Sequence, residues 1–319
     1  MKLIIQIPCY NEAKYLPITL QDLPREIEGI DQIETLVVDD GSRDNTAKVA
    51  RKNGVDHVVR FRKHRGLAAA FSAGLEACLL HEADIIVNTD ADNQYRGADI
   101  PKLIAPILKG QADIVIGDRQ TQQIEHFSWI KKKLQKWGSS VVKFLSKTDV
   151  PDAPSGFRAV SREAALKINV LSDFSYTLET LIQAGNIGLS VKSVPIETNE
   201  KIRDSRLFTN LFSFLKRSGS TILRSYTMYK PLKIFSVLAL IFFVLGLIPG
   251  IRFLYFVYIG SYQGHIQSLI LTAILLIASF LLAVMAVLSD LIASNRKLIE
   301  EILRRVRRIE SERDKKDAD

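Results

Sequence analysis

Two long stretches without a charged residue constrain this 319-residue chain more than any other feature of its sequence. They run from Ile234 to Ile251 and from Ile266 to Ser289. A helix needs about 20 mostly apolar residues to cross the hydrocarbon core of a bilayer. A core helix of a soluble protein can be equally apolar, but two such stretches with basic and tyrosine-rich flanks favour a membrane hairpin. We expect a membrane segment at 232–289, with spans at about 234–254 and 266–289.

The charges beside these stretches predict the orientation of the chain. Basic residues precede the first stretch and follow the second, whereas the intervening loop has only Arg252. Because cytoplasmic flanks of spans are enriched in Lys and Arg, we expect the part before the first span and both termini in the cytoplasm. Two spans with a short loop between them suggest a prokaryotic inner membrane. An N-terminus without the pattern of a secretory signal agrees with this orientation. The flanking basic residues are Lys216, Arg217, Arg224, Lys230, Lys233, Arg296 and Lys297.

The excess of basic over acidic residues indicates which kinds of partner the chain can bind. A formal net charge of +8 is compatible with nucleic-acid binding. However, no nucleic-acid recognition motif is present, and clustering of the charge near the spans favours anionic lipid headgroups. We therefore predict a lipid bilayer as a partner and no nucleic acid.

Short apolar runs alternate with helical patterns over about the first 118 residues, which predicts a mostly parallel sheet covered by helices. Ligands of open α/β sheets bind beyond the carboxyl ends of the strands. Polar clusters follow three predicted strands, at residues 8–12, 39–42 and 90–92, so we expect them to meet in one crevice. The predicted strands are Leu3–Ile7, Glu34–Val38, His57–Arg60, Asp84–Asn88 and Asp113–Ile116.

Acidic residues stand out in two of these clusters. Asp90 and Asp92 supply hard carboxylate oxygens and Gln94 a carbonyl oxygen, a set that suits Mg²⁺ or Mn²⁺. Turns are rich in aspartate, but the position directly after an apolar strand strengthens the metal hypothesis. The second cluster, Asp39 and Asp40, precedes a helix that Asp44 or Asn45 could cap; the paired acids could also bind the base or ribose of a nucleotide.

Five segments, in this order and spacing, resemble the family-two inverting glycosyltransferases. The similarity is to the branch of dolichol-phosphate mannose synthase and the bacterial polyprenyl-phosphate glycosyltransferases, whose two-span members also share the C-terminal hairpin. The segments are Pro8-x-Tyr10-Asn11-Glu12, Val38-Asp39-Asp40-Gly41-Ser42, Asp90-Ala91-Asp92-x-Gln94, Gly117-x-Arg119 and Asp152-x-x-Ser155-Gly156-Phe157-Arg158.

The resemblance implies an α/β GT-A domain, Rossmann-like and with a mostly parallel sheet, in residues 1–206. It implies that a hexose passes, with inversion, from a nucleotide-diphosphate sugar to a polyprenyl phosphate, with Mg²⁺ or Mn²⁺ as cofactor. A UDP-sugar is the favoured donor and GDP-mannose the alternative. The lipid-linked phosphosugar would serve cell-envelope glycan modification or protein glycosylation.

The resemblance also assigns roles to individual residues. The residues expected at the nucleotide-sugar are Pro8, Tyr10, Asn11, Glu12, Val38, Asp39, Asp40, Asp90, Ala91 and Arg206. Those expected at the acceptor phosphate are Arg119, Arg158, Arg203 and Lys132, and those at the metal are Asp90, Asp92 and Gln94. Asp152, Asp92 and Arg119 are the expected catalytic set.

Asp152 stands where the family pattern has a carboxylate often proposed as the base. A phosphate monoester already carries a charge of about −1.5 to −2 at neutral pH, so its oxygen hardly needs deprotonation. We expect Asp152 to position groups more than to remove a proton. Two segments depart from the family pattern and leave the sugar and nucleotide open: His64-Arg65-Gly66-Leu67-Ala68 and Arg203-Asp204-Ser205-Arg206-Leu207.

Three further helical segments are expected outside the sheet. Residues 125–150 combine Trp129 and Trp137 with lysines, which suits either a membrane interface or packing on the sheet. Residues 207–231 read as juxtamembrane helices, and 290–319 as a cytoplasmic C-terminal helix. That helix has a heptad pattern, which predicts a homo-oligomer; docking back on the domain is the alternative. The pattern does not give the number of copies, for which we favour a tetramer. The pattern comprises Leu288, Ile292, Asn295, Ile299, Ile302, Val306 and Ile309.

Two other functions compete with this one. A polysaccharide synthase would share the fold, but it usually carries a Gln-x-x-Arg-Trp motif and more spans, whereas neither tryptophan here follows an arginine. An inactive membrane scaffold would have no need of acids at every expected motif position.

Overall fold

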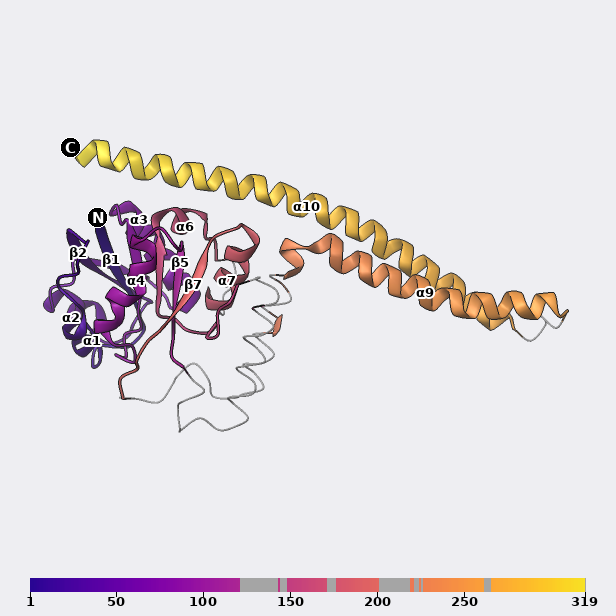
Figure 1. Cartoon of the computed structure of the whole chain (residues 1–319), viewed down its shortest axis with the longest axis horizontal. Coiled ribbons are helices and arrows are strands. Elements are labelled where there is room, and N and C mark those ends of the chain that lie inside the picture. The colour runs from indigo at the N-terminus through magenta and orange to yellow at the C-terminus, as the bar shows by residue number, and fades with distance from the viewer. Residues whose placement is uncertain are drawn as a thin grey trace. The chain divides into compact units, whose positions relative to one another are not determined.

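The computed structural model describes residues 1–120, 143, 148–170, 176–200, 219–220, 224, 226–260 and 265–318 (Figure 1). The chain divides into two compact units. The first contains Met1–Ser225 together with Glu301–Asp319, and the second contains Tyr226–Glu300. Most of the helix predicted at 125–150 and most of the segment predicted at 207–231 lie outside the described residues.

The first unit is built on a mostly parallel sheet of seven strands, in agreement with the predicted fold class. Only β6 runs antiparallel to its neighbours, β4 and β5. The five predicted strands are present: one has the predicted ends, and in the other four the ends shift by at most two residues. Strands β6 and β7 were not predicted. In spatial order the strands are β3 (His57–Arg60), β2 (Gln32–Asp39), β1 (Lys2–Cys9), β4 (Ile85–Asn88), β6 (Arg158–Ser161), β5 (Ile114–Asp118) and β7 (Val191–Pro195).

Helices cover both faces of this sheet, as Figure 1 shows. Leu3, Ile5 and Ile7 of β1 share one core cluster with Leu103 and Ile104. Because alternate side chains of a strand point to opposite faces, Ile4, which is also fully buried, faces the other side. The helices are α1 (Leu16–Asp22), α2 (Thr46–Lys52), α3 (Leu67–Leu80), the 3₁₀ turn η1 (Gly97–Asp99), α4 (Ile100–Leu108), α6 (Arg162–Lys167) and α7 (Tyr176–Asn186).

The second unit is a pair of long apolar helices, which confirms the two predicted C-terminal apolar helices. Helix α9 (Pro231–Tyr258) and helix α10 (Ile266–Ala318) are each long and apolar enough to cross a bilayer. From Glu301 on, α10 belongs to the first unit. They pack through small residues, as membrane helices do. Ser279 Oγ donates to the Ala239 carbonyl at 2.8 Å, and a Cβ added at Gly246 would lie 3.1 Å from Leu275. Helix α10 continues without a break past Ser289, so the expected C-terminal helix extends the second apolar helix.

A glycine turn at the end of β2 brings two loops together. Gly41 has φ +67°, and a Cβ added to it would lie 2.6 Å from the backbone carbonyl carbon of Lys63. Gly54, at the end of α2, also has a positive φ (+76°), but an added Cβ would meet no atom within 4 Å. The two glycines therefore differ in their surroundings while sharing a backbone conformation.

We expect Gly54→Ala to lower the free energy of unfolding by about 1 kcal/mol, since alanine is strained in the left-handed region. Gly41→Ala should cost about 2 to 4 kcal/mol, because the clash with the 63–64 backbone adds to that strain. Urea unfolding of the detergent-solubilised chain, followed by circular dichroism, would compare them. Equal losses in the two variants would contradict the close approach at Gly41.

Candidate functional site

The carboxyl ends of the parallel strands gather the polar clusters at one edge of the sheet. Cys9 at the end of β1 pairs with Asp39 at the end of β2, and Asp39 in turn pairs with Arg60 of β3. Asn88 at the end of β4 pairs with Arg158 at the start of the antiparallel β6. The loops that carry the sequence motifs therefore begin at neighbouring points of one edge.

The loop after β1 is fixed to the turn after β2. Asn11 has a positive φ of 55°. Its backbone N–H donates to Ser42 Oγ at 2.9 Å, and its side-chain oxygen accepts from the Arg43 N–H at 2.8 Å. The Glu12 N–H donates to Thr46 Oγ1 at 2.9 Å. Side-chain contacts of this kind pre-organise the predicted nucleotide-binding loop.

The paired acids at the end of β2 hold the backbone of two neighbouring loops. Asp39 is fully buried, accepts from the Ser42 N–H at 2.9 Å and forms an ion pair with Arg60 at 3.2 Å. Asp40 is 2% exposed and accepts from the N–H groups of Arg65 (2.6 Å) and Gly66 (2.9 Å). The Asp40 carboxylate thus fixes the start of α3, the segment in which this chain departs from the family pattern.

A stacked aromatic pair lies beside Asp40. The rings of Tyr10 and His64 have centroids 4.0 Å apart at an interplanar angle of 28°. His64 Nδ1 lies 2.8 Å from Asp40 Oδ2, while about half of the His64 side chain remains exposed. Tyr10 and Asp40, both predicted at the nucleotide, are therefore joined through His64, which the sequence had not assigned to the site.

The loop that carries Asp90, Asp92 and Gln94 is held from two directions. Thr19 Oγ1 donates to the Ala91 carbonyl at 2.9 Å. On the other side, Asn199 donates from its side chain to the Asn93 carbonyl at 2.9 Å and from its backbone to the Gln94 carbonyl at 3.0 Å. Asn93 has a positive φ of 53°, a conformation that asparagine tolerates better than most residues.

The oxygen donors of this loop fit a hard divalent cation, although they form an incomplete shell. Across the described ranges, no group of three or more His, Cys, Asp or Glu side chains is gathered for a metal. The predicted set has two carboxylates and one amide. A Cβ added at Gly156 would lie 3.2 Å from Asp90 Oδ1, so the carboxylate of Asp90 lies against the bare backbone of Gly156.

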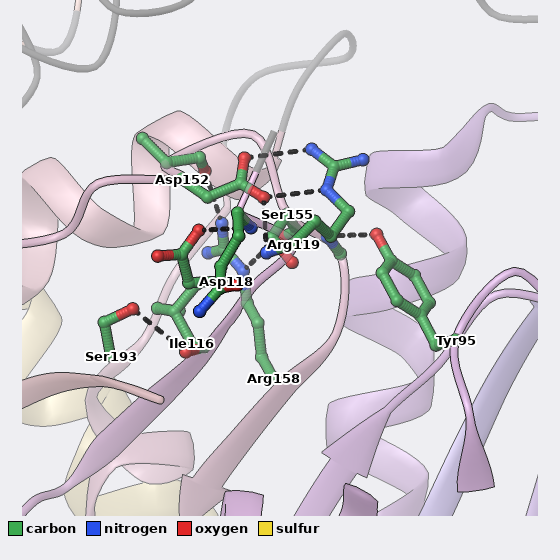
Figure 2. Close-up of polar contacts among 11 residues, drawn as sticks. Tyr95, Ile116, Asp118, Arg119, Asp152, Ser155, Arg158 and Ser193 are labelled. Carbon is green, nitrogen blue, oxygen red and sulfur yellow. Dashed lines mark hydrogen bonds and ion pairs between the residues drawn. The ribbon is translucent and has the colours of Figure 1, made fainter. Parts of the chain in front are cut away.

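Arg119 and Asp152 form a two-pronged ion pair, shown in Figure 2. Arg119 Nε donates to Asp152 Oδ2 at 2.7 Å and Nη2 donates to Oδ1 at 2.9 Å. The Asp152 side chain is 1% exposed and that of Arg119 17%. Burial alone would lower the pKa of Arg119, but Tyr95 and Asp152 outweigh it and raise this pKa above its ordinary value. Arg119 is therefore a fixed positive charge, and the Asp152 carboxylate is engaged in orienting it.

Arg158 is buried inside the domain and braces the loop that carries Asp152. It is 1% exposed and donates to the carbonyls of Ser155 and Ala153, both at 2.8 Å. It also donates to Thr180 Oγ1 at 2.6 Å. Burial lowers the pKa of Arg158 to about 10. These contacts engage three of the five N–H groups of the guanidinium inside the protein, beneath the loop. The contact between Arg158 and an acceptor phosphate stays a prediction.

A buried polar network that the sequence analysis missed supports the same loop. Gln6 Nε2 donates to Asn88 Oδ1 at 2.9 Å, and Asn88 Nδ2 donates to the Gly156 carbonyl at 2.8 Å. The Gly156 N–H donates to the Tyr95 hydroxyl at 3.1 Å. The sequence does carry a signal for this network: Gln6 and Asn88 are amide side chains inside otherwise apolar strands, and a buried amide needs hydrogen-bond partners. Lys132, Arg203 and Arg206, which were also predicted at the site, lie outside the described residues.

Comparisons with known sequences agree with these features. A model of the family described as glycosyl transferase family 2 matches residues 4–168. An uncharacterised protein of Methanocaldococcus jannaschii is 36% identical over 202 residues, which are 62% of this chain and 81% of that protein. Polyprenol monophosphomannose synthase of Mycolicibacterium smegmatis is 29% identical over 209 residues, 62% of this chain and 77% of the synthase. UDP-N-acetylglucosamine dolichyl-phosphate N-acetylglucosaminyltransferase of Methanococcus voltae is 31% identical over 216 residues, 60% of this chain and 83% of the transferase.

The fold has solved counterparts as well. Glucosyl-3-phosphoglycerate synthase from Mycobacterium tuberculosis, in complex with Mn²⁺, UDP-glucose and phosphoglyceric acid, superposes with a TM-score of 0.54 at 19% identity. The superposition covers 70% of this chain and 79% of that one. Another structure of the same synthase holds Mg²⁺ and UDP. At this level of identity the likeness shows the GT-A type of fold.

The buried ion pair yields a stability prediction. Asp152→Asn should lower the free energy of unfolding by about 3 kcal/mol, because it leaves the positive charge of Arg119 largely desolvated without its counter-ion. Glu301→Gln, which removes the partner of the half-buried Arg304 and the exposed Arg305, should leave the unfolding midpoint unchanged. Chemical denaturation of both variants would test this, and a small loss in Asp152→Asn would show that water reaches the pair.

The buried phenols yield a pH prediction. Burial raises the pKa of Tyr95 to about 12 and lifts that of Tyr176 further above its ordinary value. A phenol whose pKa is higher in the folded chain than in the unfolded chain stabilises the fold. Because a phenol in the unfolded chain titrates near pH 10, this contribution to stability is complete below about pH 10 and is lost as the pH rises above it. The lowered pKa of Arg158 affects the free energy of unfolding with the opposite sign over the same pH range, but it offsets only part of the contribution of the two tyrosines.

In an alkaline titration followed by ultraviolet absorbance, we expect a late rise in phenolate signal that coincides with loss of the circular dichroism of the sheet. Tyr95→Phe should reduce this late rise. A single early titration of all tyrosines while the sheet remains intact would contradict the burial of Tyr95 and Tyr176.

Proposed function

Because the chain belongs to glycosyl transferase family 2, whose model matches just over half of it, we propose that it transfers a hexose from a nucleotide-diphosphate sugar to a polyprenyl phosphate. Relatives named as polyprenol monophosphomannose synthase, undecaprenyl-phosphate mannosyltransferase and dolichyl-phosphate hexose transferase support this acceptor class. Two apolar helices, each long enough to cross a bilayer, agree with a lipid acceptor. The product would be a lipid-linked phosphosugar, used in cell-envelope glycan modification or protein glycosylation.

One observation carries the proposal: a fixed positive charge and a pair of carboxylates occupy the same strand-end edge. Arg119 is held by Asp152, and Gly156 of the next turn lies against Asp90. A reaction that joins a phosphate acceptor to a diphosphate donor brings several negative charges together, which must be neutralised for attack to occur. Arg119 would bind phosphate directly, while the carboxylates would bind the diphosphate through a cation.

The metal-binding residues would be Asp90, Asp92 and Gln94, whose hard oxygens suit Mg²⁺ or Mn²⁺. The metal-bound synthase structures with this fold support such a cofactor. A bound cation would neutralise charge on the leaving diphosphate. Because the described residues supply two carboxylates on this loop, we infer that phosphate oxygens of the donor complete the coordination.

The other half of the edge would hold the nucleoside. Pro8, Tyr10, Asn11 and Glu12 stand on the loop after β1, which is tied to the turn that follows Val38, Asp39 and Asp40. Ala91 would approach the donor through its backbone, and Arg206 would add a positive charge. We favour a UDP-sugar and keep GDP-mannose as the alternative, since the relatives differ in the sugar that their names state.

At the acceptor, Arg119 would orient the phosphate, with Lys132 and Arg203 as further cations. Asp152 would act through Arg119, because both of its oxygens accept from the guanidinium. The acceptor oxygen is already anionic and would attack from the face opposite the diphosphate, which inverts the anomeric centre. We place this chemistry on the cytoplasmic side of a prokaryotic inner membrane, with both termini cytoplasmic.

The test is transfer of radiolabel from a panel of nucleotide-sugars to polyprenyl phosphate, measured in the organic phase with Mn²⁺ or with chelator. Asp92→Asn should lower metal-dependent transfer by at least about 100-fold, because the developing charge loses its compensation. Asp56→Asn is the matched control: Asp56 accepts from Thr35 beside the amino end of β3, away from the site, and transfer should persist.

Full transfer by Asp92→Asn would refute the assigned metal set. A folded wild-type chain that transfers no sugar from any donor would refute the proposed reaction and favour a polysaccharide synthase or an inactive scaffold.

A further inference from the structure

The connection from β3 to α3 is strongly basic. No acidic residue occurs in the sequence between Asp56 and Glu76. Residues 60–65 form the basic loop, which comprises Arg60, Phe61, Arg62, Lys63, His64 and Arg65. All of these residues except Phe61 are exposed. The basic loop therefore presents a dense positive charge to its surroundings.

The acids of the candidate site neutralise only part of this charge. Asp39 forms an ion pair with Arg60 at 3.2 Å, and His64 Nδ1 lies 2.8 Å from Asp40 Oδ2. Among the residues that the structure describes, no carboxylate forms an ion pair with the side chains of the other three basic residues of the loop. Clustered like charges repel one another, and an anionic partner relieves this repulsion.

The backbone of the basic loop is held at both ends. The Phe61 N–H donates to the Asp39 carbonyl at 2.9 Å, and the Arg65 N–H donates to Asp40 Oδ1 at 2.6 Å. Between these points the loop lies against the glycine turn that follows β2. A backbone fixed in this way loses little conformational entropy when the loop binds a partner.

The position of the basic loop indicates which anions it meets. Arg60 pairs with Asp39 in the sheet, so the loop begins at the edge that holds the candidate site. A polyprenyl phosphate carries its phosphate at the level of the lipid headgroups, and the edge has to approach that level for transfer to occur. This step rests on the proposed function. Two helices able to cross a bilayer would also keep the chain at a membrane, where headgroups are the most concentrated anions.

We propose that the basic loop binds anionic phospholipid headgroups and thereby holds the reaction edge at the membrane surface. Arg62, Lys63 and Arg65 donate to phosphate oxygens of the headgroups, as guanidinium and ammonium groups do in other phosphate sites. The guanidinium carbon of Arg65 lies 5.0 Å from the centroid of the Phe61 ring. This ring adds an aromatic surface among the cations, a combination that suits the membrane interface.

Acylation of lysines tests the proposal on the full, unaltered chain. The protein is placed in nanodiscs of neutral phosphatidylcholine, or of an equimolar mixture with phosphatidylglycerol, and treated with a water-soluble succinimidyl ester. Peptide mass spectrometry then measures the modification of each lysine. Labelling of Lys63 should fall at least about five-fold in the anionic discs, since each basic residue at an anionic surface favours contact by about this factor. Lys52 is the matched control: it is also exposed, but α2 ends there after returning to the amino edge of the sheet, so its labelling should be the same in both discs.

Two further arms test whether charge causes the protection. Arg62→Gln with Arg65→Gln should raise the labelling of Lys63 in anionic discs. Arg51→Gln with Lys109→Gln removes the same charge from the ends of α2 and α4, at the amino edge, and should leave Lys63 protected. Salt at about 1 M, where the Debye length is about 3 Å, should also raise the labelling.

Equal labelling of Lys63 in neutral and anionic discs would overturn the proposal, and so would protection that persists in high salt. Protection by added UDP in neutral discs, without any effect of the anionic lipid, would assign the loop to the donor diphosphate instead. None of these readouts depends on sugar transfer. A chain that transfers no sugar can therefore still show the protection, and a chain that transfers sugar can fail to show it.

Discussion

The parallel pairing of β1 with β2 and β4 is the constraint on which the rest of the structure depends. Parallel strands cannot be joined by tight hairpins, so each returns through a helix, and all their carboxyl ends reach the same edge. The loops after β1, β2 and β4 consequently start beside one another. Both faces of the sheet are covered, which leaves the edge as the place where polar side chains of these loops can gather.

At that edge, acidic side chains first fix the protein's own backbone. Asp39 and Asp40 accept from N–H groups of Ser42, Arg65 and Gly66. Loops without regular structure are held in one conformation only when such contacts outweigh their entropy. Asn11, Asn93 and Gln120 adopt positive φ at this edge, and strain of this kind persists where the surroundings over-determine the backbone. The carboxylates are thus part of the framework before any ligand arrives.

The sequence predicted the strands whose apolar runs are continuous, because burial on both faces leaves a clear signal in β1 and β4. It missed β6, which begins with a buried arginine, and β7, where Lys192 and Ser193 interrupt the apolar pattern. For the site, motif position placed Asp152 and Arg119 together but could not separate Arg119 from Arg158. A sequence records that a residue is charged, whereas burial and partners, here Ser155, Ala153 and Thr180, depend on the tertiary fold.

The contrast between these two arginines explains how the loop before β6 can place a charge at the edge. Arg158 holds the loop from beneath through two carbonyls and a hydroxyl, and Asp152 at the start of that loop then presents its carboxylate to Arg119. A carboxylate that accepts through both oxygens from a guanidinium fixes the orientation of that guanidinium, because the two charge-assisted hydrogen bonds hold it in one plane. A phosphate nucleophile is already anionic, so it does not require a base, but its negative charge has to be neutralised by a fixed cation. The geometry of Asp152 therefore suits an enzyme whose acceptor is a phosphate better than one whose acceptor is a sugar hydroxyl.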